Sequence, residues 1–150
     1  MPSELKARLQ ADMKAAMKAR EKKRLGTIRL ALAALKQREV DDRIELDDTI
    51  VLSIIDKMVK QRRDSLAQFE AADREDLAAQ ERLEIDILLT YLPRQLSESE
   101  VEALVAAAVA NTGATSMKEM GALMGALRPQ VQGRADMQMV SAKVKARLSS

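Results

Sequence analysis

Three acidic side chains lie close together in the sequence, Glu81, Glu84 and Asp86, and their spacing would allow acid–base catalysis. A three-residue step brings Glu81 and Glu84 onto one face of a helix, and paired carboxylates can act as general acid and general base. The same step also fits a solvated face that pairs with the basic residues of a neighbouring helix. Basic partners for such a face precede it in the chain: Lys60, Arg62 and Arg63. We therefore favour ion pairing over catalysis for these carboxylates.

Two residue types that carry much of enzyme chemistry are absent, because the chain has no Cys and no His. No thiolate nucleophile, Cys-based metal site or histidine general base can therefore form. Tyr91 is the one phenol, and its place directly before Leu92 and Pro93 favours packing at a hinge over proton donation. We predict no catalytic residue, no metal and no cofactor. No self-contained enzyme site is visible, and whether the chain has an activity of its own stays open.

A turn near the C-terminus is the best candidate for anion binding. Gly133-Arg134-Ala135-Asp136 leads into a helix, whose first backbone N–H groups and positive dipole end suit a phosphate. Asp136 would cap that helix, however, occupying those donors and repelling an anion. A plain turn with a cap is the alternative. Lys143 and Lys145 on the last helix either extend a basic strip or simply suit the negative end of the helix dipole.

Charge is distributed unevenly along the chain, although the net charge is only +2. Residues 1–43 carry a net +6, residues 44–96 a net −5 and residues 97–150 a net +1. The first segment contains the densest basic patch: Lys14, Lys18, Lys22, Lys23, Arg24 and Arg29. Such a run is often only a solvated helix face, but it also suits a polyanion.

The composition indicates helices. Hydrophobic residues make up 47% of the chain and are mostly Ala, Leu, Val, Ile and Met, whereas aromatic residues make up 1%. Few aromatics argue against RNA-binding folds that stack bases on aromatic side chains. The chain also lacks an apolar run of the roughly 20 residues that a membrane span needs, and its start lacks the regions of a signal peptide, so we expect a cytoplasmic protein.

Apolar periodicity and capping residues predict seven helices. We expect four in an N-terminal domain, residues 1–93, then a linker at 94–96 and a three-helix bundle at 97–150. Ser3, Asp47 or Asp48, and Asp73 should begin helices in the first domain, with a tight turn near 20–22 and a loop at 41–46.

In the C-terminal part, two Ser-x-x-Glu capping boxes should begin helices at Ser97 and Ser116. Gly113 should end the first of these helices and Asp136 should cap the last. Pro129 should end the middle helix near Arg128, because proline disfavours helical geometry in the residue before it. Gly121 and Gly125 share a face of that helix and would let another backbone approach closely.

These motifs together resemble the YqeY family, the free-standing relatives of the tail domain of the GatB subunit of glutamine-dependent tRNA amidotransferases. The resemblance covers the full length and rests on five blocks in order: Arg24-Leu25-x-x-Ile28-Arg29-Leu30-x-x-Ala33-Ala34-x-Lys36, Lys60-Gln61-Arg62-x-x-Ser65, Leu77-x-x-x-Glu81-x-x-Glu84 through Tyr91-Leu92-Pro93, Met120-Gly121-x-x-Met124-Gly125 and Gly133-Arg134-Ala135-Asp136. It implies an all-α protein with a GatB tail-like C-terminal domain. It also implies the family label of carbon–nitrogen ligase with glutamine as amido-N-donor, which without a catalytic site would hold only inside a larger complex.

The resemblance and the basic residues together predict an accessory protein that binds tRNA or another structured RNA. The expected contacts are Lys118, Gly121, Gly125, Arg128, Gly133, Arg134, Lys143 and Lys145, with Arg24, Arg29 and Lys36 as a second basic surface. Amidotransferase components are possible partners, and neither DNA nor a membrane is expected. The alternative is a module that docks on an amidotransferase or another protein without touching RNA.

Overall fold

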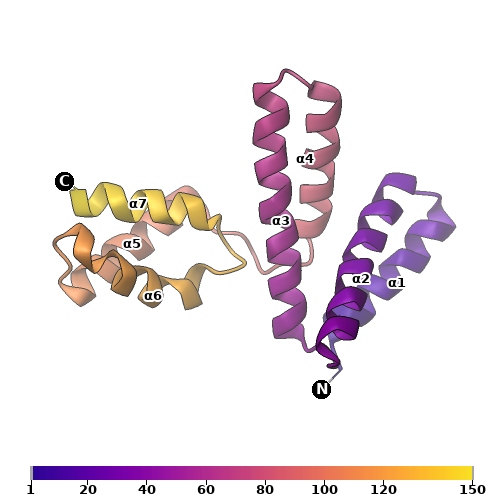
Figure 1. Ribbon diagram of the computed structural model, residues 1–150, viewed down its shortest axis with the longest axis horizontal. Helices are drawn as coiled ribbons and strands as arrows, with labels where there is room; N and C mark the ends of the chain where they lie inside the picture. The colour runs from indigo at the N-terminus through magenta and orange to yellow at the C-terminus, as the bar shows by residue number, and fades with distance from the viewer. Residues whose placement is uncertain (1, 150) are drawn as a thin grey trace. The chain divides into compact units, whose positions relative to one another are not determined.

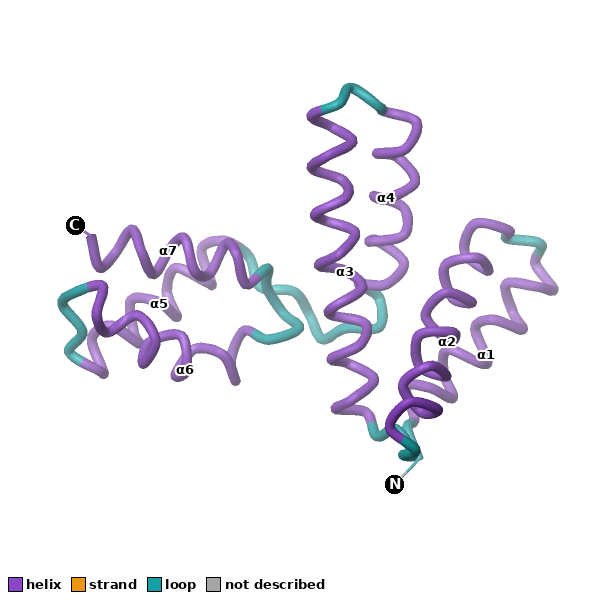
Figure 2. Tube along the Cα trace, viewed as in Figure 1, coloured by secondary structure: helices purple, strands orange, loops and turns teal. Residues whose placement is uncertain are grey.

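The computed structural model describes residues 2–149, and over this range it contains helices and connecting loops but no strand (Figures 1 and 2). The prediction of an all-α fold is therefore confirmed for the described part. The chain divides into two compact units, Met1–Leu92 and Pro93–Ser150.

The first unit is built from two helical hairpins. Helix α1 (Glu4–Ala19) packs on α2 (Lys22–Asp42), and α3 (Asp48–Ala71) packs on α4 (Glu75–Leu89) (Figure 1). Its core holds side chains from all four helices and from the loop and turn that follow α2 and α4: Leu9, Ala16, Ile28, Ala31, Leu35, Leu46, Val51, Ile55, Met58, Val59, Ile85, Ile87, Leu88 and Tyr91. The α2, α3 and α4 helices contact one another, so the hairpins share this core.

Side chains cap the first and third helices as predicted. The Ser3 hydroxyl accepts a hydrogen bond from the Lys6 N–H and donates one of 2.5 Å to the Asp48 carboxylate, which links the start of α1 to the start of α3. Asp47 is the cap of α3, since its carboxylate accepts from the Ile50 N–H at 2.9 Å.

Two boundaries in this unit differ from prediction. Helix α2 continues through Asp41 to Asp42, so the loop is shorter than the expected 41–46. Asp73 does not cap α4. It adopts a left-handed backbone with φ 59° and closes α3 instead, donating to the Glu70 carbonyl while Arg74 donates to the Phe69 carbonyl. This pair of bonds is a Schellman ending, and Asp tolerates left-handed geometry better than most residues.

The second unit is a three-helix structure. Helix α5 (Glu98–Thr112) is followed by a short 3₁₀ turn, η1 (Met117–Glu119), then α6 (Met120–Val131) and α7 (Met137–Ser149). The three α-helices contact one another in pairs and enclose a separate core: Val101, Val105, Ala108, Ala114, Leu123, Leu127, Val131, Ala135, Val140, Val144 and Leu148.

One predicted capping box forms and the other does not. Ser97 and Glu100 make both reciprocal hydrogen bonds at the start of α5, and Gly113 ends that helix with φ 68°. The box predicted at Ser116 is wrong, because its side chain makes no cap hydrogen bond. The Glu119 carboxylate instead accepts from the Thr115 N–H at 3.3 Å, and the chain passes through η1 before α6 begins.

Pro129 lies inside α6, so the predicted end near Arg128 is also wrong. Proline removes only the hydrogen bond that its own nitrogen would donate to the carbonyl of Gly125. The apolar face carries the helix past it, since Leu127 and Val131 are both fully buried. Burying a side chain of this size contributes about 2 kcal/mol, which offsets one missing bond in a last turn.

Residues 94–96, expected to form a linker, are tied into the second unit. The Leu96 N–H donates to the Arg134 carbonyl at 2.7 Å, and the Gln95 side chain donates to the Gly133 carbonyl at 2.8 Å. The division between the units falls directly after Leu92.

Candidate nucleic-acid interface

The turn between α1 and α2 is tight because α1 ends in a left-handed residue. Arg20 has φ 56°, and the Glu21 N–H donates back to the Ala16 carbonyl at 3.0 Å. This is the Schellman geometry, in which glycine usually takes the left-handed position. The chain therefore reverses within two residues, as predicted for 20–22, and holds a strained arginine at its tip.

Cations concentrate around this turn. Residues 14–30 include seven Lys and Arg and one acidic residue, Glu21. We call the cluster the hairpin tip, and its members are Lys14, Lys18, Arg20, Lys22, Lys23, Arg24 and Arg29. Every member except the half-buried Arg24 is exposed. All but Arg29 lie within two helical turns of the reversal, about 11 Å along either helix.

Most of these cations have no acidic partner in the described part of the chain. Arg24 alone is paired, with Asp12 and Glu21, and both distances are a loose 3.9 Å. Arg29 contacts the Met17 sulfur at 3.6 Å, a neutral neighbour. Lys36 lies further along α2 beside Glu39, whose pKa is lowered first by a hydrogen bond from Lys6 and further by both lysines. The hairpin tip therefore holds positive charge that the described fold does not use.

Replacing the left-handed Arg20 should affect stability and RNA affinity in opposite directions. Arg20→Gly should raise the free energy of unfolding by about 0.5–1 kcal/mol, because glycine adopts positive φ without steric strain. If the tip binds RNA, as the sequence predicts, the same change should weaken that binding, because it removes a cation from the hairpin tip. Arg43 is a matched control, since it has φ 55° at the other end of α2, about 30 Å along that helix. Urea denaturation should show both variants stabilised, and an RNA titration should show only Arg20→Gly weakened. Equal RNA affinities would contradict the prediction.

The predicted anion site at Gly133–Asp136 folds as a turn with a cap. Gly133 is buried with φ 75°, and the Asp136 carboxylate accepts from the Gln138 N–H at 3.0 Å, as expected for the cap of α7. The Arg134 side chain is partly buried and donates to the Arg94 carbonyl at 3.2 Å. The helix terminus thus already carries a carboxylate and the arginine already has an acceptor, which favours the alternative without a phosphate.

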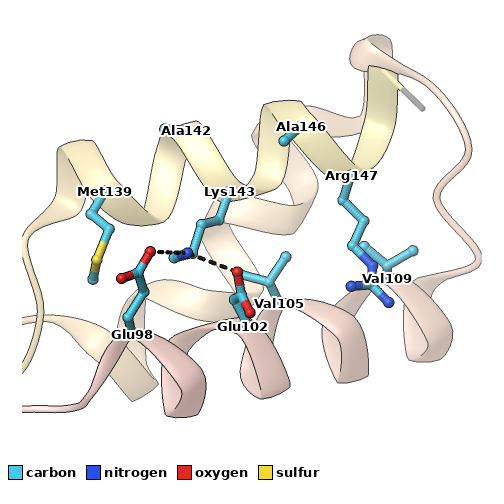
Figure 3. A pocket seen from close by; sticks show the side chains of 9 residues that line it. All are labelled: Glu98, Glu102, Val105, Val109, Met139, Ala142, Lys143, Ala146 and Arg147. Atoms are coloured by element: carbon cyan, nitrogen blue, oxygen red, sulfur yellow. Dashed lines mark hydrogen bonds and ion pairs between the residues drawn. The ribbon is translucent and has the colours of Figure 1, made fainter.

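Lys143 is held inside the second unit. Its ammonium lies 2.9 Å from both the Glu98 and the Glu102 carboxylates, and its side chain is only 14% exposed (Figure 3). The hydrogen bonds that Lys143 donates to these two carboxylates raise its pKa. A cation already shared between two carboxylates does not contribute to a surface for phosphates.

The other predicted residues of the second unit are exposed but dispersed. Lys118 lies in η1 and Arg128 in the last turn of α6, about 15 Å apart along the helix, while Lys145 lies on α7. Gly121 and Gly125 are exposed, and a β-carbon built on either would meet nothing within 4 Å. No other backbone in the described part of the second unit lies against these glycines, and close approach of RNA to them stays a prediction.

The paired carboxylates of α4 face a basic residue of α3. Arg62 donates to Glu84 at 3.0 Å, with both side chains about 15% exposed, and Gln80 donates to the other Glu84 oxygen. The Oε2 atom of Glu81 is buried without a hydrogen-bond partner. Burial, and then the Glu84 carboxylate, raise the pKa of Glu81, while Arg62 opposes both. Ion pairing with Arg62 is the arrangement that the sequence favoured over catalysis.

Tyr91, in the turn after α4, ties that turn to the α1–α2 hairpin. Its hydroxyl donates to Asp12 at 2.5 Å, and the Arg8 guanidinium lies 4.6 Å from the centre of its ring. Burial and the bond to Asp12 raise the pKa of Tyr91 to about 12. The phenol therefore stays protonated near neutral pH and ties α1 to the turn that follows α4, consistent with the packing role.

Within residues 2–149, no group of three or more acidic side chains could hold a metal ion. Over the same range, no helix is long and apolar enough to cross a membrane.

The motifs in the sequence point to the predicted RNA contacts but not to most of the hairpin tip. Lys14, Lys18, Lys22 and Lys23 were visible as a basic run, but a run alone does not distinguish free cations from paired ones. The left-handed backbone of Arg20 could not be predicted from the sequence, because it follows from the tight turn and arginine has no preference for that conformation.

The fold and its surfaces define a class: a small all-helical protein of two units, with cations concentrated on one helical hairpin. The chain belongs to the YqeY family, whose model, described as "Yqey-like protein", matches residues 6–148.

Relatives with curated names are fungal proteins called "Altered inheritance of mitochondria protein 41, mitochondrial". The relative from Pyrenophora tritici-repentis is 33% identical over 142 residues, which is 92% of this chain and 77% of that protein. The relative from Kluyveromyces lactis is 40% identical over 103 residues, 66% of this chain and 55% of that protein. A third, from Lachancea thermotolerans, is 36% identical over 102 residues. The chain thus spans little more than half the length of two of these three proteins.

Proposed function

We propose that this protein binds structured RNA, tRNA in particular, through the hairpin tip of α1 and α2. The observation that carries the proposal is the group of exposed cations there that have no acidic partner among the described residues. Phosphate charge dominates the affinity of proteins for nucleic acids, and unpaired Lys and Arg supply the complementary charge.

The shape of the tip also supports RNA. A narrow helical hairpin can approach a groove or a backbone crossing of a folded RNA, where phosphates from two strands lie close together. The chain has few aromatic side chains, so recognition would depend on shape and backbone charge rather than on stacked bases. Lys118, Arg128 and Lys145 would add weaker contacts from the second unit.

A salt series tests the proposal. Fluorescence anisotropy with labelled, folded tRNA should show an affinity that falls steeply with salt, by about 0.7–0.9 log units per log unit of salt for each phosphate neutralised. Four contacts would give a slope near −3. An affinity that does not change between low and physiological salt would contradict the proposal.

Within this proposal the protein is an accessory of a tRNA-dependent amidotransferase and resembles the tail of its GatB subunit. The family label of carbon–nitrogen ligase with glutamine as amido-N-donor would then describe the complex. The cytoplasmic location expected from the sequence is part of the proposal, whereas the relatives above are named as mitochondrial proteins.

The alternative of docking on an amidotransferase without RNA contact makes a different prediction for the isolated complex. A complex that survives nuclease treatment favours docking, and tRNA that co-purifies and is needed for the complex favours RNA binding.

A further inference from the structure

An open groove of about 810 Å³ runs between α5 and α7 in the second unit (Figure 3). Each helix contributes one stripe of side chains at three- and four-residue steps. The stripe of α5 is Glu98, Glu102, Val105 and Val109, and that of α7 is Met139, Ala142, Lys143, Ala146 and Arg147. The stripes run side by side in the same direction (Figure 3).

The groove is open because α6 packs on only one side of this helix pair. Val101 and Ala108 of α5, with Val140 and Val144 of α7, are buried in the core that α6 closes. On the other side, Ala142 and Ala146 are exposed, and their small side chains leave the space between the helices unfilled. No other segment within residues 93–149 lines this side.

Charge and apolar surface occupy different parts of the groove. At one end, Glu98 and Glu102 share the single ammonium of Lys143. The two carboxylate side chains are 74% and 62% exposed, whereas Lys143 is 14% exposed, so their negative charge faces outward. The floor beyond them is aliphatic, with Val105 and Val109 on the α5 side and Ala146 on the α7 side, and the Arg147 side chain lies beside Val109 at the far end.

We propose that this groove binds an amphipathic helix of a partner protein that carries Lys or Arg at the Glu98 end. A third helix can pack against two helices that lie side by side, with its axis at the usual distance of about 8–10 Å from each of theirs. Apolar side chains of the partner at positions i, i+4 and i+7 would fill the space over Ala142 and Ala146. Its basic residue would meet the two outward carboxylates, which carry one more charge than Lys143 neutralises.

The same charges make RNA a poor occupant. Phosphates would meet Glu98 and Glu102 at one end and aliphatic side chains along the floor, and Arg147 at the far end lies beyond that aliphatic stretch. The inference is therefore independent of RNA binding at the hairpin tip and concerns a different surface.

A designed peptide tests it with the full-length, ¹⁵N-labelled chain. The probe is a 15-residue helical peptide with Leu at i, i+4, i+7 and i+11 and two Lys at one end. The charge-reversed control peptide is identical except that Glu replaces those two Lys. The matched peptide should shift amide signals along the α5 and α7 stripes and bind at least tenfold more tightly than the control peptide. Glu98→Lys with Glu102→Lys should reverse that preference.

Two single variants locate the site. Ala142→Glu should weaken the peptide at least tenfold without changing tRNA affinity, because it fills the groove at an exposed position. Ala126→Glu makes the same change on the exposed face of α6 and should leave binding unaltered. Thermal melts of both variants check that they fold. Absent binding of the matched peptide, equal binding of both peptides, shifts outside the two stripes, or self-association of the chain through this face would each overturn the proposal.

Discussion

Reversing three charges at the hairpin tip, Lys18→Glu, Lys22→Glu and Lys23→Glu, is expected to weaken tRNA binding about 100-fold near physiological salt. A Lys–phosphate contact in water contributes about 1 kcal/mol, and 1.4 kcal/mol is a factor of ten in affinity. The salt slope should fall by about 2–3 units as three contacts are lost. Anisotropy titrations at several salt concentrations measure both quantities.

The matched control reverses the same number of charges in the second unit: Lys118→Glu, Arg128→Glu and Lys145→Glu. Both triple variants change the net charge from +2 to −4, so a general effect of net charge would weaken them equally. We expect the control to lose less than about fivefold and to keep most of its salt slope. All six side chains are exposed and none forms an ion pair in the described structure, so folding should be preserved. If the control variant bound tRNA as weakly as the tip variant, the hairpin tip would not be the main RNA-binding surface.

Removing Arg62, the partly buried arginine of α3, should have the largest effect on stability. Arg62→Met leaves the carboxylates of Glu81 and Glu84, one helical turn apart, without their guanidinium. Breaking a fully buried ion pair costs about 3 kcal/mol or more, and this partly buried pair should cost about 2 kcal/mol, because little water replaces the guanidinium and Gln80 still donates to Glu84. Urea denaturation followed by circular dichroism at pH 7 should show this loss in the first unit.

Arg82 offers the matched comparison for that experiment. It pairs with Glu75 and Glu70, but all three side chains are at least 41% exposed. Arg82→Met should produce no measurable change, since exposed ion pairs contribute little. Equal losses in the two variants would show that burial around Arg62 is not the cause.

Glu81 adds a pH dependence with a definite sign. Its pKa in the folded chain is raised above the usual 4.5, so the folded state holds a proton that the unfolded state has lost. The stabilisation that protonated Glu81 contributes is therefore fully present below pH 4.5, and it is lost as the pH rises through the raised pKa of Glu81. The loss in Arg62→Met should be smaller in acid than at pH 7, and adding Glu81→Gln should flatten that difference.

Local interactions could be read from the residue order. Ser3, Asp47, Ser97, Gly113 and Asp136 take the capping roles expected of them, because each cap bonds a neighbour only a few residues away. The same reasoning gave the all-α class and excluded thiol and histidine chemistry, which depend on composition alone. The family was recognisable because its motifs are also runs of neighbouring residues.

Only the packed chain decided which charges and faces remain available. Lys143 reads as a free cation, but its carboxylates lie more than 40 residues away in the chain, and Arg134 is bound by a carbonyl 40 residues away. Pro129 reads as a stop, yet burial of Val131 against other helices continues α6 past it. Ion pairs and burial join residues distant in the chain, so only packing determined that the cations of the hairpin tip other than Arg24 have no acidic partner among the described residues and that the α5–α7 groove stays open.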